Sequence, residues 1–401
     1  NAANPSTATR TLTFQVNDGA GANHLSNQPT RDLTVTAVND PPVLANVEGA
    51  ALTVTEGDAA KVVTSAITVT DPDGATLVGG TVQITGNCTP AEDVLALPGS
   101  PLNGVTGVYT AATCTLALSG TTTLANYETA LRAVTYLNSN TANPSTASRT
   151  LTFQVDDGQA ANNLSNQPTR SIAVTAVDDA PVITRPATVT ATEDQTFTFN
   201  VGNTISVADV DAASGSVQVT LTVTNGTLTL SGTAGLSFSF ADANGTGAGD
   251  GTADATMTFR GTLSNVNAAL NGMTYKGNAN FNGSDTLSIG VNDLGNTGTG
   301  GPLTDSKSVG ITVTPVNDAP TANAFTNLPA QASIQITYPA GKLGGTDVED
   351  GTAVTIDTTP GAVTNGTVVI RSDGSFDFTP DPDAAGGSAS FTYRVADSGV
   401  D

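Results

Sequence analysis

The chain has 401 residues, a length that predicts two to four domains of ~100–200 residues each. Its 36 acidic and 13 basic residues leave a net charge of −23, which excludes nucleic-acid binding through a basic surface and polybasic contact with anionic lipid. One histidine and no tryptophan argue against histidine-based catalysis and multi-histidine metal sites. The abundance of Thr, Val, Gly and Asn favours strands joined by turns, so we predict an all-β extracellular protein.

No apolar run approaches the ~20 residues that span a bilayer, so we expect no membrane insertion in this segment. The chain begins at Asn1 without an initiator Met or a signal-like segment. We therefore expect any signal peptide or anchor to lie outside these residues.

Long internal repeats organise the chain. The segment from Thr11 to Gly19 recurs 139 residues later, and the boundary pattern Val-Asn/Asp-Asp-Ala/Pro-Pro places Asp40, Asp179 and Asp318 at the same spacing. Both ends of the chain cut through a repeat, so we expect a window of a longer protein. The predicted domains are the C-terminal part of a β-sandwich repeat at 1–40, complete β-sandwich repeats at 41–179 and 180–318, and a truncated β-sandwich repeat at 319–401.

Short strands separated by turns every 8–12 residues are typical of a β-sandwich. In the first half of the chain we predict strands at 11–16 and 31–38. A short helical turn at 126–132, beginning at an Asn cap, leads into a strand that carries Tyr136.

The second complete repeat follows the same plan. Alternating apolar and polar residues predict strands at 216–223, 228–230 and 236–240. A helical turn is predicted at 265–270, and the strand at 308–314 ends the repeat. In the last repeat the strand region at 391–397 is the final one, because the strand that follows it in the complete repeats is missing.

Acidic residues recur at fixed places near each boundary. An Asp-x-Asp or Asp-x-Glu pattern follows each boundary by about 30 residues. In the two complete repeats a Glu lies one strand before this pattern. An Asp also closes a strand of the preceding repeat. Loops cluster at the ends of a sandwich, so we expect these groups to converge where two repeats meet. The candidate metal ligands are Asp18, Asn39, Asp40, Glu56, Asp71, Asp73, Asp157, Asp178, Asp179, Glu193, Asp209, Asp211, Asp293, Asn317, Asp318, Asp347 and Glu349.

Calcium suits this set, because Ca²⁺ takes six to eight oxygen ligands and needs neither His nor Cys. Clustered carboxylates repel one another unless a cation lies among them. The alternative is that Asp and Asn are turn formers and that the acidity keeps the surface soluble. The residues alone leave both readings open.

The Val-Asn-Asp-Ala-Pro boundary, the Thr-Glu at the first strand, the Asp-x-Asp and the Val-x-Asp-Gly resemble the cadherin-like, Ig-like tandem repeats of large bacterial extracellular surface adhesins, of the RTX-adhesin type. The resemblance covers essentially the whole chain. It implies sandwiches stacked head to tail, with Ca²⁺ held between neighbours. The chain departs from the cadherin linker pattern at Ala37 and Pro315, where an acidic residue is expected, and the last repeat lacks a Thr-Glu pair near Ala330.

The only cysteines, Cys88 and Cys114, lie in the first complete repeat and flank a Pro-containing loop. In an extracellular protein a single pair suggests a disulfide across that loop. Two free buried thiols are the alternative.

We interpret the chain as a structural stalk or spacer of a bacterial cell-surface or secreted adhesin, with neighbouring repeats as its partners and no enzymatic activity. The first alternative is a self-assembling subunit of an extracellular filament or sheath, in which successive copies exchange strands. This alternative arises because 1–40 supplies two strands without a sandwich, whereas 319–401 lacks one strand. The second alternative is a module that binds a glycan or another cell-surface ligand.

Overall fold

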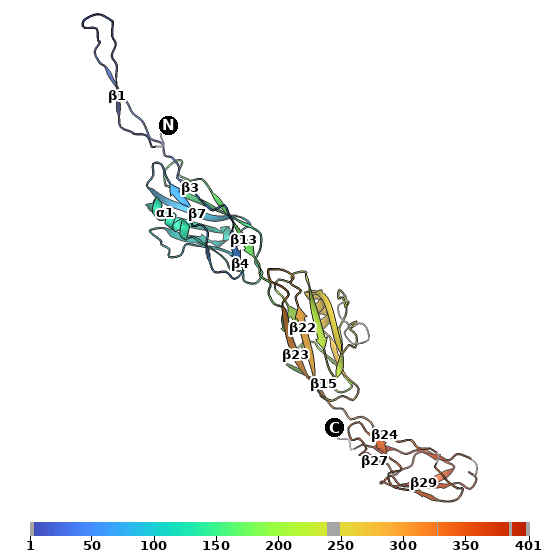
Figure 1. The fold of residues 1–401 in the computed structure, drawn as a ribbon. Coiled ribbons are helices and arrows are strands. Elements are labelled where there is room, and N and C mark those ends of the chain that lie inside the picture. The colour runs from blue at the N-terminus through green and yellow to red at the C-terminus, as the bar shows by residue number, and fades with distance from the viewer. Residues whose placement is uncertain (1–3, 239–248, 327, 385–386, 398–401) are drawn as a thin grey trace. The chain divides into compact units, whose positions relative to one another are not determined.

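The computed structural model describes residues 4–238, 249–326, 328–384 and 387–397 (Figure 1). The chain divides into two compact units. The first contains 1–179 with Val210–Ala213 and Gly295–Leu303, and the second contains the remainder. Each unit is described by itself. Strands dominate both, and two α-helices lie in the described part of the chain.

In the first unit, residues 41–179 form a β-sandwich. A six-stranded sheet with the order β4-β13-β12-β7-β10-β9 opposes a three-stranded sheet, β5-β11-β8, and a pair, β3-β6. β4 runs parallel to β13, and the other pairs are antiparallel. The strands are β3 (Val43–Ala45), β4 (Leu52–Thr55), β5 (Lys61–Val62), β6 (Thr68–Thr70), β7 (Thr76–Gly86), β8 (Asp93–Ala96), β9 (Thr106–Thr110), β10 (Thr115–Thr123), β11 (Thr135–Asn138), β12 (Arg149–Asp156) and β13 (Thr169–Thr175).

The core of this sandwich follows from the alternation of its strands. Every second residue of β12 is buried, including Leu151 and Phe153. The helix α1 (Leu124–Ala133) contacts β6, β7 and β10 (Figure 1). Its cap is the hydroxyl of Thr123, which accepts a hydrogen bond from the backbone N–H of Asn126 at 3.3 Å. The predicted Asn cap is therefore wrong, because Asn126 lies inside the helix. A 3₁₀ turn (Ala111–Thr113) precedes β10.

Residues before Asn39 form a two-stranded hairpin, β1 (Arg10–Thr13) and β2 (Thr30–Leu33), which are shorter than the predicted strands. Arg10 pairs with Leu33 in the register in which Arg149 pairs with Ile172 in β12 and β13. All eight hairpin strand residues are exposed. Leu12 is 47% exposed, whereas its counterpart Leu151 is fully buried.

In the second unit, residues 180–318 repeat this architecture. Among its described residues, the large sheet has five strands in the order β15-β23-β22-β18-β20, with a three-stranded sheet, β16-β21-β19, and a pair, β14-β17. The strands are β14 (Val182–Thr184), β15 (Thr188–Thr192), β16 (Thr196–Thr198), β17 (Ser206–Ala208), β18 (Ser216–Thr222), β19 (Gly226–Thr229), β20 (Thr256–Thr262), β21 (Thr274–Gly277), β22 (Gly283–Asn292) and β23 (Thr304–Thr314).

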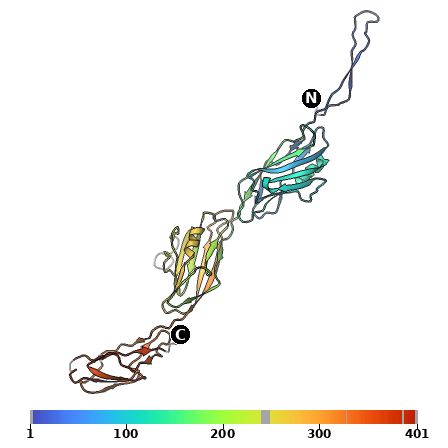
Figure 2. The same ribbon diagram turned by 180° about the vertical axis from the view of Figure 1, so that it is seen from behind.

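The helix α2 (Leu263–Leu270) contacts β17, β18 and β20 in this sandwich (Figure 2). Thr262 caps it by accepting from the N–H of Asn265 at 3.4 Å, so here too the threonine replaces the predicted Asn cap. The strands predicted at 216–223 and 308–314 correspond to β18 and to part of β23. Of the strand predicted at 236–240, Leu236 to Phe238 form only an isolated bridge through Ser237, and the rest lies outside the described residues.

Residues 319–397 form shorter pieces of sheet around an aromatic core that contains Tyr338, Phe376 and Phe378. The pairs are β24-β26, β27-β32 and β28-β31, beside a three-stranded sheet, β25-β30-β29. The strands are β24 (Thr321–Ala322), β25 (Ile336–Tyr338), β26 (Gly345–Thr346), β27 (Thr355–Ile356), β28 (Val363–Thr364), β29 (Gly366–Ile370), β30 (Phe376–Pro380), β31 (Ser390–Phe391) and β32 (Val395–Ala396).

Candidate functional site: acidic clusters at the repeat boundaries

Three groups of acidic and amide side chains gather near the repeat boundaries. Hydrogen bonds or charge interactions connect the members of the first and third groups. In the second group, Asp179 is hydrogen-bonded to Asp211, and Glu56 accepts from the N–H of Val177, which precedes Asp178. We call them the first junction (Asn39, Asp40, Asp71, Asp73 and Asp157), the second junction (Glu56, Asp178, Asp179 and Asp211) and the third junction (Glu193, Asp194, Asp318, Asp347 and Glu349).

The same backbone contact recurs in all three junctions. The N–H of the aspartate in the boundary pattern donates to the second acidic residue of the Asp-x-Asp or Asp-x-Glu pattern. The contacts join Asp40 to Asp73 (3.3 Å), Asp179 to Asp211 (2.9 Å) and Asp318 to Glu349 (3.3 Å). The recurring sequence spacing therefore corresponds to a recurring structural contact.

The second recurring contact is made by a glutamate that directly follows β4 in one repeat and β15 in the next. The Oε2 atom of Glu56 accepts from the N–H of Val177 at 2.9 Å, and the Oε2 atom of Glu193 accepts from the N–H of Val316 at 3.0 Å. In both residues the other oxygen, Oε1, is buried and has no hydrogen-bond partner in the part of the chain that the structure describes. Glu193 retains 1% of its surface exposed. One oxygen of each glutamate thus positions its side chain, and the other has no hydrogen-bond donor among the described residues.

Other junction carboxylates repeat this division of roles. In Asp347, Oδ1 accepts from the N–H groups of Glu349 and Asp350 at 3.0 and 2.9 Å, while Oδ2 has no partner. A buried charged oxygen without a hydrogen bond is energetically costly, and a hard cation with oxygen ligands satisfies such atoms. Among the described residues, buried atoms of this kind include Glu56 Oε1, Asp71 Oδ2, Asp179 Oδ2, Glu193 Oε1, Asp318 Oδ2, Asp347 Oδ2 and Glu349 Oε1.

The electrostatics of the third junction show that its carboxylates repel one another. Burial raises the pKa of Asp318, and the charges of Asp194, Glu193 and Asp347 raise it further. Burial also raises the pKa of Glu349, with Asp347 again contributing. Both shifts reflect burial together with mutual repulsion among these carboxylates.

Asparagine side chains bring a further acidic residue to the first and third junctions. The amide of Asn39 donates to Asp157 Oδ2 at 2.9 Å, and the amide of Asn317 donates to Asp397 Oδ2 at 3.1 Å. Asp397 was not among the predicted site residues. Its signal was present, since Val395-Ala396-Asp397 follows the same strand-closing pattern as Val155-Asp156-Asp157.

The remaining predicted residues are placed differently. Asp18 is exposed in the hairpin, where its Oδ1 accepts from the N–H of Ala20 at 3.0 Å, as a turn former does. Asp209 and Asp293 belong to the second unit, whereas Asp211 is grouped with the first. Asp293 is fully buried.

Within the described ranges, no group of three or more His, Cys, Asp or Glu side chains has an arrangement that could hold a metal ion. Any argument that these residues bind a cation therefore depends on the buried oxygens without hydrogen-bond partners, because no complete set of ligands surrounds one point in the described ranges. No helix in the described part of the chain is long and apolar enough to cross a membrane.

Cys88 and Cys114 are joined by a disulfide, with their Cα atoms 6.3 Å apart. Cys114 is fully buried at the start of β10, and Cys88 packs against the same core. The bond links the end of β7 to β10, two strands that also pair directly.

Two family models match parts of the chain. Residues 317–400 match a bacterial Ig domain, and residues 203–298 match the Protein GAMETE EXPRESSED 2 domain. No curated protein matches the chain.

Solved structures similar to the chain include protocadherin gamma B2 extracellular cadherin domains 1–5, at 13% identity and a TM-score of 0.37, with 96% of this chain and 65% of that chain covered. Another is mouse cadherin-23 EC22–24, at 14% identity and a TM-score of 0.32, with 89% of this chain and 98% of that chain covered. The chain thus spans about two thirds of the first of these structures. Its own architecture is all-β, with Ig-like sandwich repeats.

Proposed function

We propose that the chain is a structural repeat region, a stalk or spacer, of an extracellular bacterial adhesin, and that Ca²⁺ at the junctions stiffens the connections between its repeats. The observation that carries this proposal is the recurrence of buried carboxylate oxygens without partners at equivalent positions. Glu56 and Glu193 each leave Oε1 in this state, and Asp179 and Asp318 each leave Oδ2. A turn former has no need of a second buried oxygen, so the recurrence favours a ligand role.

The residues that would hold the ion in the third junction are Glu193, Asp318, Asp347 and Glu349. Ca²⁺ would supply the positive charge that their mutual repulsion favours. Because these residues come from 180–209 and 318–349, a shared ion would connect segments on both sides of the boundary. Extracellular calcium modules commonly bind with a Kd of ~10⁻⁴–10⁻³ M, so millimolar Ca²⁺ would load the sites.

The test compares the whole chain in Ca²⁺ and in chelator. We expect calorimetric titration to show Ca²⁺ binding, thermal unfolding to occur at a higher temperature in Ca²⁺, and X-ray scattering to give a larger maximum dimension. The double substitution Glu193→Gln with Asp347→Asn should lower the number of ions bound. It should also reduce the stabilisation, because each change removes a charge and leaves a neutral amide.

Asp383→Asn is the matched control, since Asp383 is exposed and lies away from the junction residues in sequence. This variant should bind as many ions as the parent chain. If Ca²⁺ produces no heat, no stabilisation and no change in dimension, the acidic residues are turn formers and the calcium part of the proposal is wrong. Equal losses in the control and the double variant would point to nonspecific screening of the net charge.

A further inference from the structure

Each complete repeat pairs a strand near its start with its last strand, and both pairs are parallel (Figure 1). In 41–179, β4 runs beside β13 with Leu52 next to Ile172. In 180–318, β15 runs beside β23 in the same way, over five residues. Among the described strands, β13 is the only sheet partner of β4, and β23 is the only sheet partner of β15. Separating either pair therefore detaches the start of the repeat from its end.

The direction of these strands decides how tension reaches the hydrogen bonds between them. The chain enters β4 before it reaches β13, and it leaves the sandwich after β13; β15 and β23 follow the same order. Because the paired strands are parallel, pulling on both ends of a repeat draws them in opposite directions along their length. The hydrogen bonds run between the strands, so they bear the load together instead of opening one after another.

Apolar side chains cover the core side of both pairs. Val54 and Ile172 of the first pair are 2% and 0% exposed, and Ile311 and Val313 of the second are 1% and 2% exposed. Backbone groups that lose their partners in such surroundings cost free energy until water reaches them. This cost raises the barrier to sliding one strand along the other.

A glutamate extends each parallel pair toward the point where the chain leaves the sandwich. The N–H of Glu56 donates to the carbonyl of Thr175 at 2.9 Å, and its Oε2 accepts from the N–H of Val177 at 2.9 Å. Glu193 makes the same two contacts in 180–318, at 2.9 and 3.0 Å. The carboxylate takes the position of a further backbone carbonyl, and an ionised acceptor makes a stronger hydrogen bond than a neutral one.

We propose that the parallel pair, together with its glutamate, is the element that resists unfolding when a complete repeat is stretched by its ends. This resistance belongs to each sandwich by itself, whereas the stiffening by Ca²⁺ concerns the connections between repeats. The two effects also use different atoms. The glutamates hold the last strand through Oε2, and their Oε1 atoms are the ones without a hydrogen-bond partner among the described residues.

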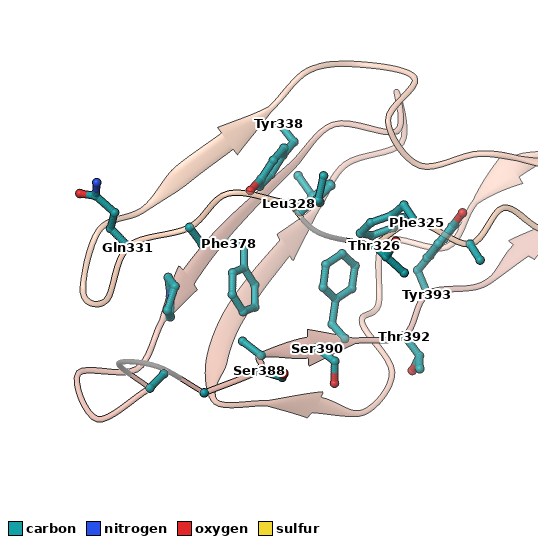
Figure 3. Close-up of a pocket in the computed structure, with 18 of the residues that line it drawn as sticks. Phe325, Thr326, Leu328, Gln331, Tyr338, Phe378, Ser388, Ser390, Thr392 and Tyr393 are labelled. Carbon is teal, nitrogen blue, oxygen red and sulfur yellow. The ribbon is translucent and has the colours of Figure 1, made fainter.

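Force spectroscopy on single molecules of the whole chain, held by its two ends at constant force and in chelator, measures this resistance. The disulfide identifies the repeats, because it keeps 26 residues from extending. The repeat 41–179 should therefore release about 90 Å less length than 180–318, and a reductant should remove the difference. The segment 319–397, whose aromatic core Figure 3 shows, has fewer residues and should release the shortest length.

Glu193→Ala should raise the unfolding rate of 180–318 at constant force by at least about tenfold, because it removes a hydrogen bond to a charged group from the pair that must separate. The repeat 41–179 of the same molecule should unfold at its original rate. Glu193→Gln keeps an oxygen that can accept from Val316, so it should retain most of the resistance.

Val266→Ala is the matched control for stability. Val266 is fully buried in α2, which contacts β17, β18 and β20, whereas the parallel pair consists of β15 and β23. The change should lower the equilibrium stability of 180–318. It should leave the unfolding rate under load nearly unchanged, because α2 is still packed when the two strands separate.

An unfolding rate that Glu193→Ala leaves unchanged overturns the proposal. So does a rate that Val266→Ala raises as much as Glu193→Ala, since resistance would then reflect the stability of the whole sandwich. Because the measurement is made in chelator, its outcome is independent of Ca²⁺ binding. A chain that binds no Ca²⁺ can still show the resistance, and a chain without the resistance can still bind Ca²⁺.

Discussion

The guanidinium of Arg149 and the carboxylate of Asp93 form an ion pair in the core of the first sandwich, with Nε 3.1 Å from Oδ1 and neither side chain exposed. The hydroxyl of Tyr136 donates to the same Oδ1 at 2.6 Å. Burial and this hydrogen bond raise the pKa of Tyr136, so the phenol stays protonated and remains a donor. The pair connects β8 to β12, strands that belong to opposite sheets of the sandwich.

Arg149→Met should therefore destabilise the first sandwich strongly. The substitution removes the cation and leaves Asp93 charged in the core, a change that costs about 3–5 kcal/mol. Differential scanning calorimetry should show one unfolding transition shifted to a lower temperature. Hydrogen exchange should assign the loss of stability to 41–179 rather than to 180–318. Adding Asp93→Asn should recover part of the stability. If the double variant is no more stable than Arg149→Met, the penalty does not come from the unpaired carboxylate.

The side-chain amide of Asn166 acts as a short strand partner for β3. Its Oδ1 accepts from the N–H of Leu44 and its Nδ2 donates to the carbonyl of Leu44, both at 2.8 Å. Asn166→Ala should destabilise the sandwich by about 2 kcal/mol, because two backbone groups lose their partners. Exchange of the Leu44 amide should accelerate at the same time. In the second unit, the equivalent residue Asp305 accepts from the N–H of Ile183 at 2.9 Å, and as a carboxylate it cannot donate to the Ile183 carbonyl.

Asn166→Asp is the informative control for this prediction. It keeps an oxygen that can accept from Leu44, as Asp305 does from Ile183, but it loses the donor. Its stability should lie between those of the parent and the alanine variant. An aspartate variant as unstable as the alanine variant would mean that the donated hydrogen bond, rather than the accepted one, provides the stability.

Sequence periodicity predicted the sandwich strands well where one face is buried. The alternation in β12 and β18 follows the side chains that enter the core, and this pattern is local in the sequence. The strands of 319–397 are shorter than the sequence suggests, since β31 and β32 contain two residues each. Strand length depends on a neighbouring strand to pair with, and that neighbour is distant in sequence.

The acidic clusters could be predicted only in part, for the same reason. The spacing that relates Asp179 to Asp318 is visible in one sequence, and so is the pattern that contains Asp211. Which oxygen accepts a backbone N–H and which is buried without a partner depends on how the loops fold. The helix caps illustrate a local error of this kind. Thr123 and Asn126 are both good cap residues, and the strand that ends at Thr123 decides between them.

The disulfide should stabilise one repeat only. Cys88 and Cys114 are 26 residues apart, and a cross-link over such a loop contributes about 3 kcal/mol by restricting the unfolded chain. We expect mass spectrometry of the unreduced protein to show the linked peptides. Reduction, or the pair Cys88→Ser with Cys114→Ser, should lower the transition of 41–179 alone. Two alkylatable thiols in the unreduced protein would contradict the prediction, and so would an equal shift in 180–318.

Glu48 lies between β3 and β4, and several hydrogen bonds join its carboxylate to the loop between β5 and β6. Thr64 Oγ1 donates to Oε2 at 2.7 Å, and the N–H and hydroxyl of Ser65 donate to Oε1 at 2.8 and 3.0 Å. Arg170 lies 3.5 Å from Oε2. Burial disfavours the charged form, but the hydrogen bonds from Thr64 and Ser65 outweigh it and lower the pKa of Glu48 from 4.5 to about 2.

This lowered pKa makes a specific prediction about acid stability. A carboxyl group whose pKa is lower in the folded state contributes stability above its unfolded pKa of 4.5, and loses it as the pH falls toward about 2. Glu48→Gln should therefore lower the melting temperature at neutral pH, and the difference from the parent should shrink between pH 4.5 and 2. Circular dichroism melts across this range measure the difference, with exposed Asp383→Asn as the control. A difference that stays constant down to pH 2 would mean that Glu48 stabilises the fold by packing, because the ionised carboxylate would then contribute nothing.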